Sequence, residues 1–324
     1  MARRSITITA GAVGAGALLL AGMALPAQAA GATTTCVGSV SGATVPGNLV
    51  VPAGESCSVT DSTVAGRVSV GAGADLLVDN VTVAGTVTVA SDGLLDSLDS
   101  DMASTVSLTR SYGAYLEGSH VGGEVISQTA GFTYSVDSQH DRDVRSANGE
   151  LYLEGSSVAE RVMSIGDLLS DINNTTINGT VLIDGAQLGS ILCDSEIDGQ
   201  TIIRNSADFV QIGGDSPRPG CGTTVFGGEL SLRTNKAAVS VNDAIIGGDL
   251  FCTGNAVMPT GADNRVRGAQ LGNCATLGAE ATMKIQQRSL AVPAEERKSD
   301  ALDRLEERRA TAAEAVAAAG VAKI

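Results

Sequence analysis

One short stretch of the chain brings together several side chains that could do acid–base chemistry. The segment DSQHDRDVRS at 137–146 contains a histidine, three carboxylates and two arginines. Histidine and carboxylates are the usual general acids and bases, and arginine binds anionic groups. The candidate catalytic residues, if the protein is an enzyme, are His140, Asp141, Arg142, Asp143 and Glu160. We favour the structural alternative, a local network of salt bridges that replaces one corner of the fold.

The remaining sequence contains no established catalytic or metal-binding motif. No P-loop, HExxH or GxSxG pattern is present. The acidic segment SDGLLDSLDSD at 91–101 does not follow the spacing of an EF-hand loop. No CxxC pattern or cluster of cysteine and histidine indicates zinc. We therefore expect no metal and no cofactor, and we lean against an enzymatic activity.

A repeat of 19–20 residues sets the position of these side chains. The phrase Val-Ala-Gly-x-Val-x-Val occurs in STVAGRVSV at 62–70 and again in NVTVAGTVTV at 80–89. About twelve copies keep this register from Gly47 to Gly268, with an apolar residue two positions before and after most anchor positions. One longer step contains a loop insertion at 213–222. Arg142 and Glu160 stand where two copies would have the anchor glycine.

Such a copy is too short for a strand and a crossover helix, but it fits one coil of a β-solenoid. Apolar and polar residues alternate after most anchors, as in a strand with one buried face. We predict an all-β fold, a right-handed parallel β-helix of about twelve coils over residues 30–283. At ~4.8 Å per coil its length would be roughly 55–60 Å. The unbroken register indicates one elongated domain.

Two polar columns accompany the strands, and both favour turns. We expect a polar ladder along one corner of the solenoid, and we expect the anchor glycines to adopt backbone angles that other residues resist. The hydroxyl column consists of Ser62, Ser100, Ser119, Ser138, Ser156, Thr175 and Ser195. The Asp/Asn column consists of Asp61, Asn80, Asp99, Asp137, Asn174, Asp194, Asp243 and Asp263.

The six cysteines fall at spacings that match neighbouring coils. Residues one coil apart lie within disulfide reach of each other. The register therefore predicts three bridges, which are Cys36–Cys57, Cys193–Cys221 and Cys252–Cys274.

The N-terminal residues predict export. Residues 1–29 have a basic start, an apolar stretch and an Ala-x-Ala site before Ala30, as in a secretory signal peptide cleaved after Ala29. We favour the Sec route over the twin-arginine route, and we expect a secreted or cell-surface protein with no membrane span after cleavage. Disulfides suit this oxidising location.

The composition excludes some partners. The formal charge is −15, and removal of Arg3 and Arg4 would make it −17, so nucleic acid is not an expected partner. The chain has no tryptophan and only 2% aromatic residues, which counts against platforms that stack on sugars.

The C-terminal segment 284–324 has a different character. From Pro293 it is rich in Ala, Glu and Arg, with Leu302 and Leu305 as a narrow apolar stripe and Gly320 suited to a helix end. We expect a charged helical tail that is solvated or partly disordered. The alternatives are a cap over the last coil and a helix for self-association.

The repeat phrases resemble those of a known group of β-helices. Val121-Gly-Gly-Glu-Val125 and Ile246-Gly-Gly-Asp-Leu250 are similar to repeats of bactofilin-type polymer-forming proteins, over about residues 43–270. In architecture the chain also resembles the pectate-lyase-like β-helix superfamily. The first resemblance implies a scaffold, and the second implies cleavage of polysaccharides.

Together these observations predict a secreted structural or surface-interaction protein built as a rigid rod. The alternative is an extracellular polysaccharide lyase or hydrolase, or a glycan-binding β-helix, that uses the charged coil around His140. The expected partners are an extracellular polysaccharide or a cell-envelope component, and a second copy through the tail. An ice-binding face is disfavoured, because no regular threonine column continues along the repeats.

Overall fold

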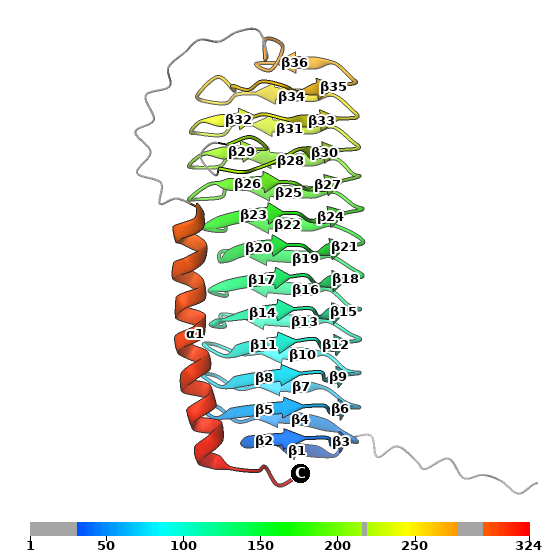
Figure 1. Ribbon diagram of the computed structural model, residues 1–324, viewed down its shortest axis with the longest axis vertical. Coiled ribbons are helices and arrows are strands. Elements are labelled where there is room, and N and C mark those ends of the chain that lie inside the picture. Colours follow the sequence, from blue (N-terminus) through cyan, green and yellow to red (C-terminus); the bar gives the residue numbers. More distant parts are fainter. Residues whose placement is uncertain (1–30, 216–218, 278–293) are drawn as a thin grey trace, which may run out of the picture.

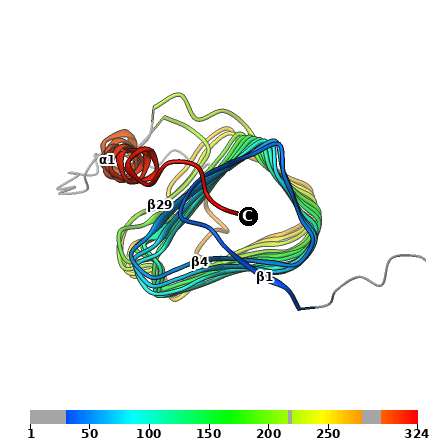
Figure 2. The same ribbon diagram turned by 90° about the horizontal axis from the view of Figure 1, so that it is seen from below.

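The chain winds into a parallel β-solenoid whose cross-section is a triangle (Figures 1 and 2). The computed structural model describes residues 31–215, 219–277 and 294–324. Most coils contribute one strand to each of three parallel sheets, here called A, B and C, and the chain makes about twelve turns. The predicted fold, a parallel β-helix followed by a C-terminal helix, is confirmed.

The strands of sheet A follow the anchor positions. They are β1 (Thr33–Thr35), β4 (Asn48–Val51), β7 (Val68–Val70), β10 (Val87–Val89), β13 (Val106–Thr109), β16 (Val125–Gln128), β19 (Val144–Ala147), β22 (Val162–Ile165), β25 (Val181–Asp184), β28 (Thr201–Arg204), β31 (Leu230–Arg233), β34 (Leu250–Thr253) and β36 (Gln270–Gly272).

The strands of sheet B come next in each coil. They are β2 (Gly38–Ser41), β5 (Ser56–Thr60), β8 (Asp75–Asp79), β11 (Leu94–Leu98), β14 (Gly113–Glu117), β17 (Phe132–Val136), β20 (Glu150–Glu154), β23 (Leu169–Asn173), β26 (Ser190–Cys193), β29 (Val210–Ile212) and β32 (Val239–Val241).

The short strands of sheet C end just before the anchors. They are β3 (Thr44–Val45), β6 (Thr63–Val64), β9 (Thr82–Val83), β12 (Asp101–Met102), β15 (His120–Val121), β18 (Gln139–His140), β21 (Ser157–Val158), β24 (Thr176–Ile177), β27 (Glu196–Ile197), β30 (Thr224–Phe226), β33 (Ala244–Ile246) and β35 (Arg265–Val266).

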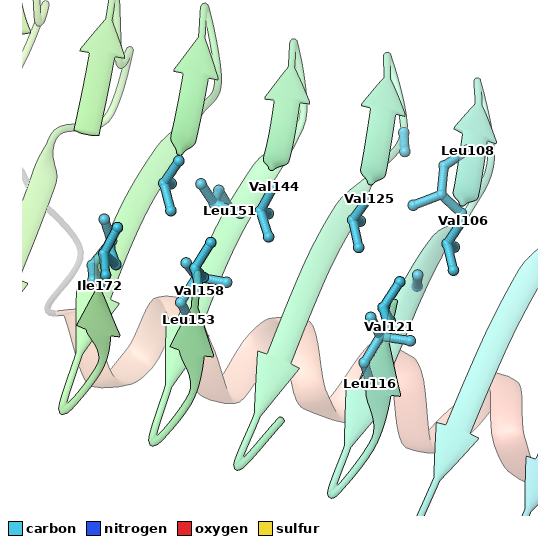
Figure 3. Packing of buried hydrophobic residues seen from close by; sticks show 14 of the residues in the cluster. Val106, Leu108, Leu116, Val121, Val125, Val144, Leu151, Leu153, Val158 and Ile172 are labelled. Carbon is cyan, nitrogen blue, oxygen red and sulfur yellow. The ribbon is translucent and has the colours of Figure 1, made fainter. Parts of the chain in front are cut away.

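Inward residues stack in columns that fill the interior (Figure 3). In sheet A, Val106, Val125 and Val144 face one another through successive strand pairs and are fully buried. Branched side chains suit this position because they pack well on a pleated surface. The alternation seen in the sequence is therefore the alternation between core and surface.

The anchor glycines are required for a reason other than the one we predicted. They do not have positive φ angles. A Cβ atom on Gly66 would lie 2.5 Å from the carbonyl oxygen of Gly47, and one on Gly199 would lie 2.3 Å from that of Gly179. Glycine is needed there because the backbones of successive coils approach closely at this corner.

The unusual backbone angles belong instead to the Asp/Asn column between sheets B and C. All eight of its predicted members have φ between 46° and 59°. Aspartate and asparagine tolerate this region better than other residues with side chains. Beside them the hydroxyl column forms the predicted ladder, since the backbone N–H of Ser119 donates to Ser138 Oγ and that of Ser138 donates to Ser156 Oγ.

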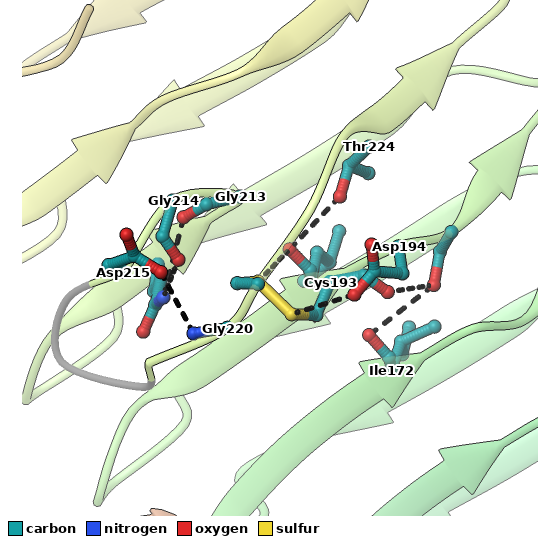
Figure 4. Close-up of a disulfide and its surroundings, with 12 residues drawn as sticks. Ile172, Cys193, Asp194, Gly213, Gly214, Asp215, Gly220 and Thr224 are labelled. Atoms are coloured by element: carbon teal, nitrogen blue, oxygen red, sulfur yellow. Dashed lines mark hydrogen bonds between the residues drawn. A yellow bond between two sulfur atoms is a disulfide. The ribbon is translucent and has the colours of Figure 1, made fainter.

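Three disulfides connect neighbouring coils, in the pairs that the register predicts. Cys36–Cys57 joins the first coil to the second, and Cys252–Cys274 joins the last two. Cys193–Cys221 holds the base of the inserted loop, where Asp215 Oδ1 accepts a hydrogen bond from the Gly220 N–H (Figure 4). Their Cα–Cα distances of 5.2–5.7 Å are usual for disulfides.

The C-terminal helix α1 (Ala294–Ala319) runs back along the outside of the solenoid toward the first coil (Figure 1). After it, Val321 pairs with Ser39 in β2, and the Ala322 N–H donates to the Ser39 carbonyl. Seen from below, this segment crosses the open end of the triangle (Figure 2). The expectations of a solvated helix and of a cap over the last coil are therefore both wrong, because the helix is docked and it is the first coil that is covered.

The predicted signal peptide, residues 1–29, lies outside the described residues. In the described part of the chain, no helix is both long and apolar enough to span a membrane.

Candidate functional site

The structure separates the residues of the charged coil. His140 lies in β18 and points into the solenoid, where it is 1% exposed. Its Nε2 atom lies 2.7 Å from Ser135 Oγ, and its Nδ1 atom has no hydrogen-bond partner. Burial lowers the pKa of His140 to about 4, so the ring is neutral at physiological pH. A neutral ring enclosed in the core has no path to a substrate.

Asp143 is also buried, and its carboxylate serves as the centre of an ion-pair network. Arg161 donates to it from Nη2 at 2.6 Å and from Nε at 3.1 Å, and the Arg161 N–H donates at 3.0 Å. Arg145 adds a contact from Nη2 at 2.8 Å. Burial alone would raise the pKa of Asp143, but these hydrogen bonds hold it below its usual range. The carboxylate is thus held charged and engaged.

The other candidates lie on the surface. Arg142 and Glu160, the two residues that replace anchor glycines, form an exposed pair with Nη1–Oε1 at 2.7 Å. Asp141 accepts hydrogen bonds from the Gln139 amide and from His120. Of the five candidates, only Asp141 contacts a group that titrates near neutral pH.

That group is His120, in β15 on the outer face of sheet C. Its Nδ1 lies 3.0 Å from Asp101 Oδ1, and its Nε2 lies 3.0 Å from Asp141 Oδ2. Burial opposes ionisation, but the carboxylates of Asp141 and Asp101 raise the pKa of His120 above its usual range. The strand register places Asp101 beside His120, one coil earlier in the chain. This pair could therefore have been found in the sequence by counting back one coil from His120. Unlike the buried His140, the His120 side chain is partly exposed to solvent.

A second site lies on the outer face of sheet B, and sequence reasoning missed it. All four tyrosines of the chain and one phenylalanine gather there. Tyr115, Tyr134 and Tyr152 face one another on consecutive strands, and Phe132 packs between Tyr112 and Tyr134 with ring centroids 5.7 and 5.0 Å apart. The three tyrosines on consecutive strands are 19 and 18 residues apart, one coil each, and this spacing in the sequence could have indicated the aromatic row.

Gly113 makes room for this aromatic row. A Cβ atom at Gly113 would lie 2.4 Å from the Phe132 ring, so the ring covers the glycine backbone. The low overall content of aromatic residues therefore hides a local concentration of them, on one face of one sheet.

Helix α1 covers the aromatic row. Leu305 packs against Leu94, Tyr115, Phe132 and Tyr134 and is 1% exposed. The Tyr112 hydroxyl donates to the Arg304 carbonyl at 2.9 Å. Apolar side chains of the helix thus complete the aromatic cluster, Leu305 as a buried member and Leu302 as a partly buried one.

Arginines of α1 bind carboxylates on both sides of this contact. Arg309 donates to both oxygens of Asp96, at 2.6 and 2.7 Å, and its guanidinium lies 4.6 Å from the Tyr115 ring centroid. Arg308 donates to Asp75 Oδ1 at 2.8 Å. Two-point contacts between arginine and a carboxylate fix orientation as well as adding attraction. The face recognises a helix that carries leucine and arginine together.

Comparison with known proteins gives no match: no family model, no curated protein and no solved structure is significantly similar to this chain.

Proposed function

We propose that this protein is a secreted, rigid β-solenoid rod that acts as a structural or surface-interaction element outside the cell. The observation that carries the proposal is that disulfides lock both ends of the repeat. Terminal repeats are the parts of a solenoid that fray most easily, because they have a neighbour on one side only. Cys36–Cys57 and Cys252–Cys274 restrain these coils, and such bonds persist in oxidising surroundings.

The charged coil supports a structural role as well. His140 is enclosed in the core, Asp143 is held by two arginines, and Arg142 pairs with Glu160 at the surface. The likeness of the Gly-Gly phrases to bactofilin-type repeats fits a scaffold. The partners we propose are an extracellular polysaccharide or a cell-envelope component, together with a second copy through the tail.

Fractionation of cells that express the full chain tests this role. We expect the protein in the medium or on the surface, with an N-terminus at Ala30 and all six cysteines protected from alkylation before reduction. An intracellular protein with free thiols would refute the extracellular role.

The second candidate function is that of a polysaccharide lyase, hydrolase or glycan-binding protein. The exposed row of Asp101, His120 and Asp141 favours it, since a histidine between two carboxylates can transfer protons to a bound substrate. A glycan array and a depolymerisation screen should compare the wild type with His120→Gln and with His140→Val. Activity lost only in His120→Gln would establish this function, and no binding or turnover in the wild type would exclude it for the glycans screened.

A further inference from the structure

We propose that the outer face of sheet B is a receptor for an amphipathic helix that presents leucine and arginine on one side, and that α1 of a second copy occupies it by exchange with the chain's own α1. This names the surface used in the self-association proposed above and rests on it, but it requires no particular location of the protein.

Charge is segregated on the solenoid. The strands of sheet B contain seven carboxylates, and in the described solenoid no lysine or arginine lies in these strands or in the turns that lead from sheet B to sheet C. The basic residues of the described solenoid are Arg67, Arg110, Arg142, Arg145, Arg161, Arg204, Arg233, Lys236, Arg265 and Arg267. The charged side chains in the described strands of sheet B are therefore all acidic, and three of them, Asp75, Asp96 and Glu150, form salt bridges with arginines of α1.

Helix α1 has the complementary pattern on one side. Leu305 and Ala312 are buried two helical turns apart, and Arg308 and Arg309 between them point at carboxylates of sheet B. The acidic residues among the described side chains of the helix are all exposed, namely Asp303, Glu306, Glu307 and Glu314. The face thus selects a helix by the position of arginine and leucine along it.

The docked helix is held by few side chains. Leu305 and Ala312 alone are buried among the described side chains from Leu302 to Ala319. The arginine contacts are partly open to solvent, where ion pairs are screened and contribute little individually. After α1, Val321 also pairs with Ser39 in β2, but the strands of the three sheets pair with one another and not with α1, so the helix can leave without unfolding the solenoid.

The chain between the two parts is long enough for exchange. Sixteen residues, 278–293, separate the solenoid from α1, which begins beside β23 (Figure 1). Sixteen residues span up to about 55 Å when extended, whereas five coils occupy about 24 Å. The connection therefore also reaches sheet B of an adjacent rod. Reciprocal exchange would preserve every helix–sheet contact in a two-fold dimer, so concentration favours it.

A charge-swap experiment on the full-length chain tests this proposal. Arg309→Glu reverses the charge at one position of the helix, and Asp96→Arg reverses the charge of its partner on sheet B. Each variant alone has mismatched charges both within one chain and between identical copies. In a mixture, each helix matches the face of the other variant. We expect each variant alone to sediment as a monomer and the mixture to form a 1:1 heterodimer at least tenfold more tightly, weakening as salt is raised.

Three controls keep the result interpretable. The chain with both changes should behave as the wild type does, and Leu305→Asp in both partners should abolish the heterodimer. A synthetic peptide of residues 294–324 should bind the Arg309→Glu chain at least tenfold more tightly than the Asp96→Arg chain. Each variant is first checked for native strand content by circular dichroism.

Two outcomes would overturn the proposal. One is a mixture of folded variants that stays monomeric and a peptide that does not discriminate between them. The other is equal dimerisation of every sample, which would place association on another surface. An intracellular location would refute the extracellular role and leave this result unchanged.

Discussion

Replacement of His140 by valine should change how the free energy of unfolding depends on pH. The folded protein holds the pKa of His140 at about 4 because the ring is buried, whereas the ordinary value is 6.5. Between these two values the unfolded chain binds a proton that the folded chain does not. Acid therefore lowers the stability of the wild type in this window. At 1.36 kcal/mol per pH unit, the full loss is about 3 kcal/mol.

Valine removes this penalty and restores the apolar column between Val121 and Val158, its neighbours across the strand pairs. At pH 7.5 the two proteins should be about equally stable, or the variant slightly more so, because the unpaired Nδ1 atom is also removed. Ser135 keeps a hydroxyl partner in Ser156, at 3.2 Å. At pH 4 the variant should be the more stable by about 3 kcal/mol.

Denaturant unfolding of both proteins from pH 4 to 7.5 measures the difference between their free energies of unfolding. Both proteins contain the same carboxylates, so the contributions of these groups cancel in the difference. His120→Gln is the matched control and should show the opposite sign. The raised pKa of His120 stabilises the fold below pH 6.5, and this contribution is lost as pH rises through the folded value. A difference between His140→Val and wild type that does not change with pH would refute a buried, neutral His140.

Three further changes test other parts of the structure. Gly113→Ala should cost about 1–3 kcal/mol and increase hydrogen exchange in α1, because the new Cβ atom meets the Phe132 ring. Replacing both Cys252 and Cys274 by serine should lower the free energy of unfolding by about 3 kcal/mol, measured by thermal unfolding, since the bond closes a loop of 22 residues. Asp143→Asn should destabilise the protein at pH 7 by about 2 kcal/mol, with the deficit shrinking as acid neutralises the wild-type carboxylate, whose folded pKa is lowered.

The solenoid could be predicted because each coil repeats the same information about twelve times. An irregular copy, such as the one containing Arg142, does not obscure the register that its neighbours share. The disulfide pairs followed from that register alone, since one coil of separation brings two cysteines within reach. The role of the anchor glycines did not follow, because close approach of two backbones is a property of the stacked coils and not of one copy.

The charged coil was harder to interpret, because residues that are adjacent in the sequence point in different directions at a corner. His140 faces the core, Asp141 faces His120 on the outside, and Asp143 lies under two arginines. Their proximity in the chain predicted a cluster that the strand geometry divides. His140 stands two residues before the anchor position of Arg142, where most copies have an apolar residue, and this position indicates a buried side chain.

The surface on which the C-terminal helix docks is identified by comparing the charges along the columns of stacked side chains. In a solenoid, an outward side chain meets the coils above and below it, so charge is balanced along columns. In the irregular coils this balance is complete within the repeat: Arg142 meets Glu160 and Asp143 meets Arg161, each pair 18 residues apart. The columns of sheet B contain carboxylates and no basic residue in the described solenoid, so a basic partner for Asp75, Asp96 and Glu150 has to come from outside these columns. Helix α1 supplies it, and we expect a second helix that presents leucine and arginine in the same order to compete for the same columns.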